Sequence, residues 1–281
     1  MAVTGATGIV GGAVARRLAA AGVTERLLVR SPDRSPRLPD AEVVVAPYGD
    51  ATAVQAALTG IETVFMVSGA EEPRRRADHF TFVEAAASAG VRRIVYTSFA
   101  GAGPDSTFLL ARDHWFTEER IRELGLAFTF LRDNLYADLL IDFAGPEGVL
   151  RGPAGDGRVA AVARADVIDA ALAIIGSVTA ATGIESPHDG RTYRLTGPAA
   201  LTLDEVAEII TTVTGRRVSY QRESVEQAYE SRSAFGAAQW QLDAWVSTYT
   251  AIAAGELAEV TDDVEQLTGR PAIGLAELLG G

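Results

Sequence analysis

The fold is decided by the stretch Met1-Ala2-Val3-Thr4-Gly5-Ala6-Thr7-Gly8-Ile9-Val10-Gly11 at the start of the chain. Residues 1–4 predict a short buried strand, the apolar spacing up to residue 21 predicts a helix, and residues 26–30 predict a second strand. A strand, a glycine turn, a helix and a strand in this order are the context that a dinucleotide-binding fingerprint requires.

Each glycine of this turn has its own physical role in such a site. Gly5 permits the tight turn, Gly8 lets the main chain approach a pyrophosphate, and Gly11 lets the helix pack closely on the strand. The free amide groups at the start of the helix then face the phosphates. A glycine turn without a ligand is the alternative, but the flanking periodicities favour the cofactor site. The predicted phosphate-binding residues are Gly5, Ala6, Thr7, Gly8, Ile9, Val10 and Gly11.

The end of the second strand indicates which dinucleotide binds. An NAD site usually has Asp or Glu about 20 residues after the glycines, where it binds the ribose 2′-hydroxyl. This chain has Arg30 there, followed by Asp33 and Arg34. Because a guanidinium suits a phosphate, Arg30 and Arg34 predict NADP(H) as the cofactor. The alternative is that both arginines are solvated and that Asp33 binds the hydroxyl of NAD.

The composition argues against several classes of function. The chain has 281 residues, 48% of them hydrophobic, which is enough for one large α/β domain with a smaller appendage. A net charge of −12 argues against nucleic-acid binding. The basic run Arg74-Arg75-Arg76 is expected to be a solvated helix face, and no apolar run is long enough to cross a membrane. Association of the chain into a homo-oligomer is compatible with the sequence.

Cysteine and lysine are both missing from the sequence. Without cysteine there are no disulfides and no thiolate ligands, and this usage fits a cytoplasmic protein in which no signal peptide precedes the first strand. The three histidines lack metal-ligand spacing, so we expect no metal site. Without lysine, a Tyr-x-x-x-Lys acid, a Schiff base and a phosphate-binding lysine of the Walker type are impossible.

Apolar segments of strand and helix type alternate along the first half of the chain. Further strands are predicted at residues 42–46 (a buried strand), 63–67, 93–96 and 127–131. Helices are predicted at residues 51–58, 73–89 and 108–124. This alternation predicts an α/β fold with a doubly wound parallel sheet.

The regular alternation of strand and helix segments ends beyond residue 140, where a small, mostly helical C-terminal lobe is expected. It is predicted to hold strands at 192–196 and 218–220, a helix at 203–214, and helices around 224–231, 237–254 and 262–268. We assign residues 1–145 to an NADP-binding Rossmann domain and residues 146–281 to a smaller substrate-binding lobe. A helix at residues 165–176 is expected to return to the first domain.

Ligands of a doubly wound sheet bind outside the carboxyl ends of its strands. The residues at these ends are therefore candidates for the site. Besides the glycine turn and the two arginines, the predicted cofactor-binding residues are Asp50, Val67, Ser68, Gly69, Thr97, Ser98 and Asn134.

Several longer stretches resemble a known family. Gly5-Ala6-Thr7-Gly8, Leu28-Val29-Arg30, Tyr48-Gly49-Asp50 and Ala89-Gly90-Val91 resemble the NmrA-like atypical short-chain dehydrogenases. Ala111-Arg112-Asp113-His114, the run from Thr129 to Tyr136, Gly155-Asp156-Gly157-Arg158 and Gly269-Arg270-Pro271 are similar to the bacterial type 2 NAD(P)H:quinone oxidoreductases. The resemblance implies a Rossmann domain with a small lobe, NADPH as cofactor, and direct reduction of small quinones without flavin or metal.

Hydride transfer to a quinone needs orientation and a hydrogen-bond donor for the developing phenolate. The candidate catalytic donors are Ser98, His114 and Asn134, and the candidate substrate-binding residues are His114, Asn134 and Tyr136. Each also has a structural alternative: Ser98 can cap a turn, His114 can satisfy a buried carbonyl, and Asn134 can cap a helix, while Tyr136 can fill the core.

Two classes of function follow from these observations. The first is an NADPH-dependent oxidoreductase that passes hydride to a small-molecule electron acceptor such as a quinone. The second is a non-catalytic, NADP-sensing regulator of the NmrA-like type that binds a protein partner.

Overall fold

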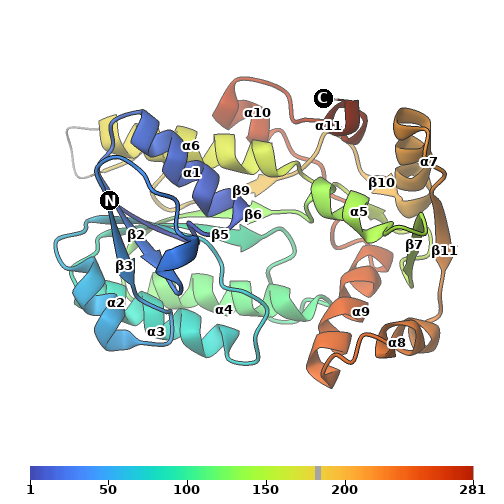
Figure 1. Cartoon of the computed structure of the whole chain (residues 1–281), viewed down its shortest axis with the longest axis horizontal. Coiled ribbons are helices and arrows are strands. Elements are labelled where there is room, and N and C mark those ends of the chain that lie inside the picture. Colours follow the sequence, from blue (N-terminus) through green and yellow to red (C-terminus); the bar gives the residue numbers. More distant parts are fainter. Residues whose placement is uncertain (181–184, 281) are drawn as a thin grey trace. The chain divides into compact units, whose positions relative to one another are not determined.

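The structure, a computed structural model, describes residues 1–180 and 185–280. Its central sheet has seven strands in the order β3-β2-β1-β4-β5-β6-β9 (Figure 1). The strands are β1 (Ala2–Thr4), β2 (Glu25–Val29), β3 (Ala41–Val45), β4 (Thr63–Met66), β5 (Arg93–Phe99), β6 (Ala127–Asp133) and β9 (Arg191–Leu195). The pairs β1–β2, β2–β3, β1–β4 and β4–β5 are parallel. The predicted doubly wound α/β fold is confirmed, and the strand order reverses beside β1, which is where such sheets bind ligands.

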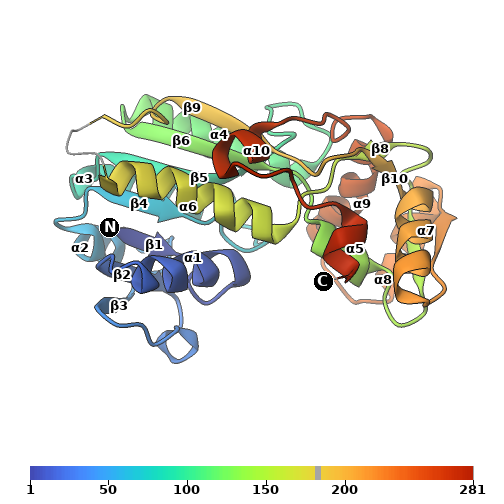
Figure 2. The ribbon, with the colours of Figure 1, turned by 90° about the horizontal axis from the view of Figure 1, so that it is seen from above.

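Helices cover both faces of this sheet. On one face lie α1 (Ile9–Ala20) and α6 (Arg164–Ala180), and Figure 2 shows them side by side. Arg17 on α1 forms an ion pair with Asp169 on α6. On the other face lie α2 (Ala51–Leu58), α3 (Arg75–Ser88) and α4 (Leu109–Glu123).

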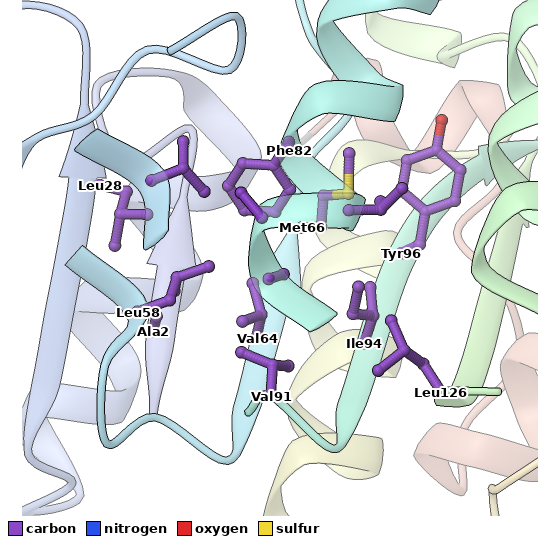
Figure 3. Packing of buried hydrophobic residues seen from close by; sticks show 14 of the residues in the cluster. Ala2, Leu28, Leu58, Val64, Met66, Phe82, Val91, Ile94, Tyr96 and Leu126 are labelled. Atoms are coloured by element: carbon purple, nitrogen blue, oxygen red, sulfur yellow. The ribbon is translucent and has the colours of Figure 1, made fainter. Parts of the chain in front are cut away.

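A hydrophobic core of the first unit lies between the sheet and the layer of α2 and α3 (Figure 3). Leu58 of α2 and Phe82 of α3 are fully buried against Val64 and Met66 of β4. Each such side chain contributes about 1.5–3 kcal/mol by leaving water. This packing holds the carboxyl ends of β1 and β4 in place, and these ends form the candidate site.

The chain divides into two compact units. The first comprises Met1–Ser98, Asp113–Leu131 and Ile168–Tyr193, and the second comprises Phe99–Arg112, Arg132–Val167 and Arg194–Gly281. The units are interleaved along the chain, and α6 from Ile168 onward belongs to the first. The functional division into a cofactor domain of residues 1–145 and a substrate lobe of residues 146–281 stays a prediction.

Short helices and strands make up the rest of the second unit. The helices are α5 (Ala137–Phe143), α7 (Leu203–Thr214), α8 (Val225–Ser233), α9 (Gln239–Ala253), α10 (Asp263–Thr268) and α11 (Leu275–Gly280). Two strand pairs accompany them: β8 (Arg158–Val159) with β10 (Leu201–Thr202), and β7 (Val149–Gly152) with β11 (Ser219–Arg222).

Two details of the predicted strands are wrong. The strand β3 was expected to be buried, but it is the edge of the sheet, and its Val43 and Val45 are 39% and 50% exposed. An edge strand has a neighbour on one side only, so apolar residues alone do not show that a strand is central. Thr97 and Ser98 lie inside β5 rather than after it, and both are buried.

Candidate active site

The glycine turn has the geometry that its sequence predicts. Gly5 has a φ of +65°, and its carbonyl oxygen accepts a hydrogen bond of 2.9 Å from the amide of Gly8. A Cβ atom added to Gly11 would lie only 2.5 Å from that same carbonyl oxygen. The close packing of helix α1 on strand β1 therefore requires glycine at residue 11.

No side chain among the described residues caps the start of α1. Gly8 is the N-cap, and the first turn of the helix has no acidic residue. The first amide groups of a helix and its dipole favour an anion at this position. The absence of a Cβ atom at Gly8 lets such an anion approach the main chain. The turn therefore fits the pyrophosphate of a dinucleotide.

A cavity of about 410 Å³ lies within the first unit, beside this turn. Seven of the predicted cofactor-binding residues line it: Gly5, Thr7, Gly8, Arg30, Val67, Ser68 and Gly69. The other predicted cofactor-binding residues are not among its lining residues: Ala6, Ile9, Val10, Gly11, Arg34, Asp50, Thr97, Ser98 and Asn134. Asp50 caps α2 by accepting from the amide of Ala53, and Arg34 is exposed in the short 3₁₀ helix Pro32–Arg34. Their roles in cofactor binding stay predictions.

Eleven lining residues are not among the predicted ones, and five of these have polar side chains: Tyr48, Glu72, Arg75, Asp78 and His79. Tyr48 belongs to the motif Tyr48-Gly49-Asp50 that follows β3, in which Asp50 is the predicted cofactor-binding residue. The other four lie on α3 or just before it. No local pattern marks them, because only the packing of α3 on the sheet brings them to the cavity.

Arg30 directly follows the last residue of β2, which is the position predicted for a residue that binds a 2′-phosphate. Its guanidinium donates to a carboxylate oxygen of Glu72 at 2.7 Å, and the two side chains are 65% and 50% exposed. An ion pair this exposed contributes about 0–1 kcal/mol. Glu72 therefore orients Arg30 without preventing it from binding a phosphate.

The prediction that all three arginines of the basic run are solvated is wrong for Arg75. Its side chain is 4% exposed, whereas those of Arg74 and Arg76 are 78% and 51% exposed. Arg75 donates from Nε to the carbonyl oxygen of Gly69 at 3.0 Å and lies 3.6 Å from a carboxylate oxygen of Asp113. One buried arginine of the three is therefore part of the cavity wall.

His114 belongs to a polar network that includes Arg75 of the cavity lining. Its Nε2 lies 2.8 Å from a guanidinium nitrogen of Arg75, which can only donate. The ring proton of neutral His114 is therefore on Nδ1, which donates to the hydroxyl of Tyr96 at 3.0 Å. Both ring nitrogens are used inside the protein, and this geometry favours the structural alternative for His114. Its roles in catalysis and substrate binding stay predictions.

His79 belongs to the same network. Its Nε2 accepts from the amide of Gly69 at 2.8 Å, so its proton is on Nδ1, which lies 2.9 Å from the hydroxyl of Thr117. Thr117 in turn donates to the carbonyl oxygen of Asp113. Burial, together with the positive charge of Arg75, holds the pKa of His79 well below its usual value. His79 is therefore neutral near pH 7.

Ser98 also has a partner inside the protein. Its hydroxyl donates to a carboxylate oxygen of Glu118 on α4 at 2.6 Å, and both residues are buried. Glu118 also lies 3.4 Å from a guanidinium nitrogen of Arg122. Ser98 lies inside β5 and not after its end as predicted, and its hydroxyl points toward α4. Its catalytic role stays a prediction.

Asn134 and Tyr136 belong to the second unit. The side-chain amide of Asn134 donates to the carbonyl oxygen of Leu257 at 3.0 Å, and its Oδ1 accepts from the amide of Leu135 at 2.8 Å. The hydroxyl of Tyr136 lies 3.0 Å from Oδ2 of Asp133, and the guanidinium of Arg164 lies over its ring. Their roles toward cofactor and substrate stay predictions.

Asp133 is a buried carboxyl group with an incomplete set of hydrogen bonds. It is 3% exposed, and its Oδ1 has no hydrogen-bond partner among the described residues. Burial raises the pKa of Asp133 well above its usual value, although the hydrogen bond from Tyr136 acts in the opposite direction. The folded protein therefore holds a proton on Asp133 at a pH where the unfolded chain has lost it.

We expect Asp133→Asn to stabilise the protein at neutral pH. Because the pKa of Asp133 is higher in the folded protein, protonated Asp133 contributes its full share of stability below the unfolded pKa of about 3.9. This share is lost as the pH rises toward the folded pKa. The substitution removes this loss, so the free energy of unfolding should increase by roughly 1–3 kcal/mol at pH 7. At pH 4 the variant and the wild type should differ little. Urea unfolding at both pH values measures the difference, and an equal effect at the two would contradict the assignment.

Two further expectations concern metal ions and membranes. Among residues 1–180 and 185–280, no group of His, Asp and Glu side chains is arranged to hold a metal ion. No described helix is both long and apolar enough to cross a membrane.

Comparison with known proteins identifies the family. Residues 5–177 match the model of an NAD(P)H-binding family, and the chain is 31% identical to quinone oxidoreductase 2 of Escherichia coli over 99% of this chain and 96% of that one. The chain belongs to this NAD(P)H-binding family. The resemblance to NmrA-like dehydrogenases and type 2 quinone reductases is confirmed.

Other members of the family are similar over nearly their whole length. The (4-alkanoyl-5-oxo-2,5-dihydrofuran-3-yl)methyl phosphate reductase of Streptomyces griseus is 36% identical over 96% of this chain and 93% of that one. The solved structure of E. coli quinone oxidoreductase 2 with NADPH has a TM-score of 0.87, with 31% identity over 99% and 98% of the two chains. That of Citrobacter triphenylmethane reductase with NADP(H) has a TM-score of 0.85, with 30% identity over 99% and 98%. The chain is thus an NAD(P)H-dependent oxidoreductase, and NADP(H) is its cofactor.

Proposed function

We propose that the chain transfers hydride from NADPH to a small quinone or a similarly electron-poor acceptor. The observation that supports this most directly is the cavity of the first unit. It joins an uncapped helix start at Gly8 to the guanidinium of Arg30, and these are the two groups that NADP requires. The similarity to a quinone oxidoreductase over 99% of the chain supports the acceptor class.

The cofactor supplies the hydride, and the residues of the chain bind and orient. The start of α1 would hold the pyrophosphate, and Arg30 would bind the 2′-phosphate. The wall Val67–Ser68–Gly69 would lie along the dinucleotide. In this assignment the predicted Arg34, Asp50 and Thr97 support the site from outside the cavity lining.

A quinone suits a chain that has no lysine. Its reduced oxyanion is a weak base, because the charge is spread over the ring, so it can accept hydrogen bonds until water protonates it. A carbonyl substrate would leave a strongly basic alkoxide and would need a strong acid. The predicted donors Ser98, His114 and Asn134 would stabilise and orient, and none of them would be indispensable.

The experiment is NADPH oxidation with a panel of quinones, followed at the absorbance of the reduced nicotinamide. We expect turnover of small quinones by the purified protein without added flavin or metal, and no loss of activity with EDTA. Titration of NADPH without acceptor is the control. Tight NADPH binding with no oxidation by any quinone would overturn the proposed acceptor and favour an NADP-sensing role.

A further inference from the structure

The segment Val67–Ser68–Gly69, at the end of β4, is held by side chains rather than by neighbouring strands. Its three successive amide groups donate to Oγ1 of Thr4, to Oγ1 of Thr97 and to Nε2 of His79, each at 2.8 Å. The three acceptors come from β1, β5 and α3, which are far apart in the sequence. The whole run lines the cavity of the first unit.

Two carbonyl groups of the segment are held in the same way. The hydroxyl of Tyr48 donates to the carbonyl oxygen of Val67 at 2.5 Å, and Nε of Arg75 donates to that of Gly69 at 3.0 Å. Gly69 is therefore bound at both its amide and its carbonyl. A Cβ atom added to Gly69 would lie 3.1 Å from Nε2 of His79, so the imidazole sits directly against this main chain.

These bonds decide what the wall offers to a ligand. The amides of residues 67–69 are all used inside the protein, so they are not available for a phosphate. The hydroxyl of Ser68 has no hydrogen-bond partner among the described residues, and Ser68 lines the cavity. Residues 67–69 therefore offer the hydroxyl of Ser68 to a ligand. The position of this hydroxyl depends on the main chain of Val67 and Gly69, which the hydrogen bonds hold in place.

We propose that His79 and Arg75 are positioning residues. They hold Gly69 between them, an arrangement called the clamp below, and so keep the segment Val67–Ser68–Gly69 in place for the dinucleotide. The inference rests on the proposed cofactor site. His79 acts through the amide of Gly69 and Arg75 acts through its carbonyl, and neither needs to touch the cofactor. The clamp lies next to the glycine turn, because a Cβ atom on Gly5 would lie 2.9 Å from Cβ of Val67.

Two substitutions of His79 distinguish the effect of losing the clamp on NADPH binding from the effect of a lower overall stability. The amide of Gln can place its oxygen near the position of Nε2, so His79→Gln keeps an acceptor for Gly69 and loses the donor to Thr117. The amide of Asn can place its nitrogen near the position of Nδ1, so His79→Asn keeps the donor to Thr117 and loses the acceptor for Gly69. His79→Asn loses the bond from Gly69, and His79→Gln loses the contacts of Nδ1 with Thr117 at 2.9 Å and with Tyr96 at 3.4 Å. The Tm of each variant measures what these losses cost in stability.

The measurements are the Kd of NADPH by fluorescence titration, the KM for NADPH, the kcat and the Tm of both variants. We expect His79→Asn to raise the Kd and KM for NADPH at least about fivefold, with kcat at saturating NADPH close to wild type. His79→Gln should stay within about twofold of wild type. Equal weakening in both variants, or no weakening in His79→Asn, would overturn the proposal.

A second pair makes the same test at Ser68, should the His79 variants fail to fold. Thr97→Ser keeps the acceptor for the Ser68 amide, and Thr97→Val removes it at nearly the same volume. NADPH should bind more weakly to the valine variant alone. Arg30→Ala distinguishes the two possible failures. If it weakens NADPH binding and the clamp variants do not, only the clamp is wrong; if it has no effect, the cofactor site itself is wrong.

Discussion

Gly11→Val is expected to abolish NADPH binding and to lower the free energy of unfolding by roughly 3 kcal/mol. A side chain at residue 11 would place its Cβ atom 2.5 Å from the carbonyl oxygen of Gly5 and 2.6 Å from that of Thr4. Both are main-chain atoms of the turn, so they cannot rotate away as a side chain would. The start of α1 must then move off β1, and the pyrophosphate loses its amide groups.

Urea unfolding and NADPH titration measure the two effects of Gly11→Val. Gly176→Ala is the matched control, because an added Cβ atom in this part of α6 meets no atom within 4 Å. It should raise the free energy of unfolding by up to about 1 kcal/mol, as expected for glycine to alanine inside a helix. A Gly11→Val variant that folds stably and binds NADPH like the wild type would contradict the role of the turn.

Arg30→Ala is expected to weaken NADPH binding about ten- to a hundredfold and to leave NADH binding nearly unchanged. A hydrogen bond to a charged group contributes about 1.5–3 kcal/mol, and NADH has no 2′-phosphate to receive it. The exposed pair with Glu72 offsets little of this, since such a pair is worth about 0–1 kcal/mol. Titration of both cofactors measures the selectivity.

Two further variants sharpen this test. Arg34→Ala should have a much smaller effect, because Arg34 is not among the lining residues of the cavity. Glu72→Gln should strengthen NADPH binding slightly, because it removes a negative charge near the 2′-phosphate and frees Arg30. Equal losses of NADPH and NADH in Arg30→Ala would show that Arg30 supports the cavity and does not select the cofactor.

The buried histidines show why catalytic candidates are hard to choose from sequence. The sequence makes His114 a candidate catalytic donor. In the structure its two nitrogens bond to Arg75 and Tyr96, residues that lie 39 and 18 positions away along the chain. Whether a polar side chain faces a ligand or another side chain depends on partners that no local pattern identifies.

The sequence by itself determined the features that depend on neighbouring residues. The turn at Gly5 needs a positive φ, and the helix start at Gly8 needs no Cβ atom, so both are readable from three glycines at fixed spacing. The capping box at the start of α7 is equally local: Thr202 accepts from the amide of Glu205, whose side chain accepts from the amide of Thr202. The alternation of strands and helices, and with it the doubly wound sheet, follows from the same short-range rules.

Only the tertiary structure decided which polar residues share the site. Arg74, Arg75 and Arg76 are identical in type and adjacent in sequence, yet packing of α3 on the sheet buries Arg75 alone and brings it to Gly69. Burial of Asp133 likewise depends on how the chain surrounds the end of β6. The physical reason is that burying a charge or a polar group is favourable only with a partner, and these partners come from distant elements of the chain.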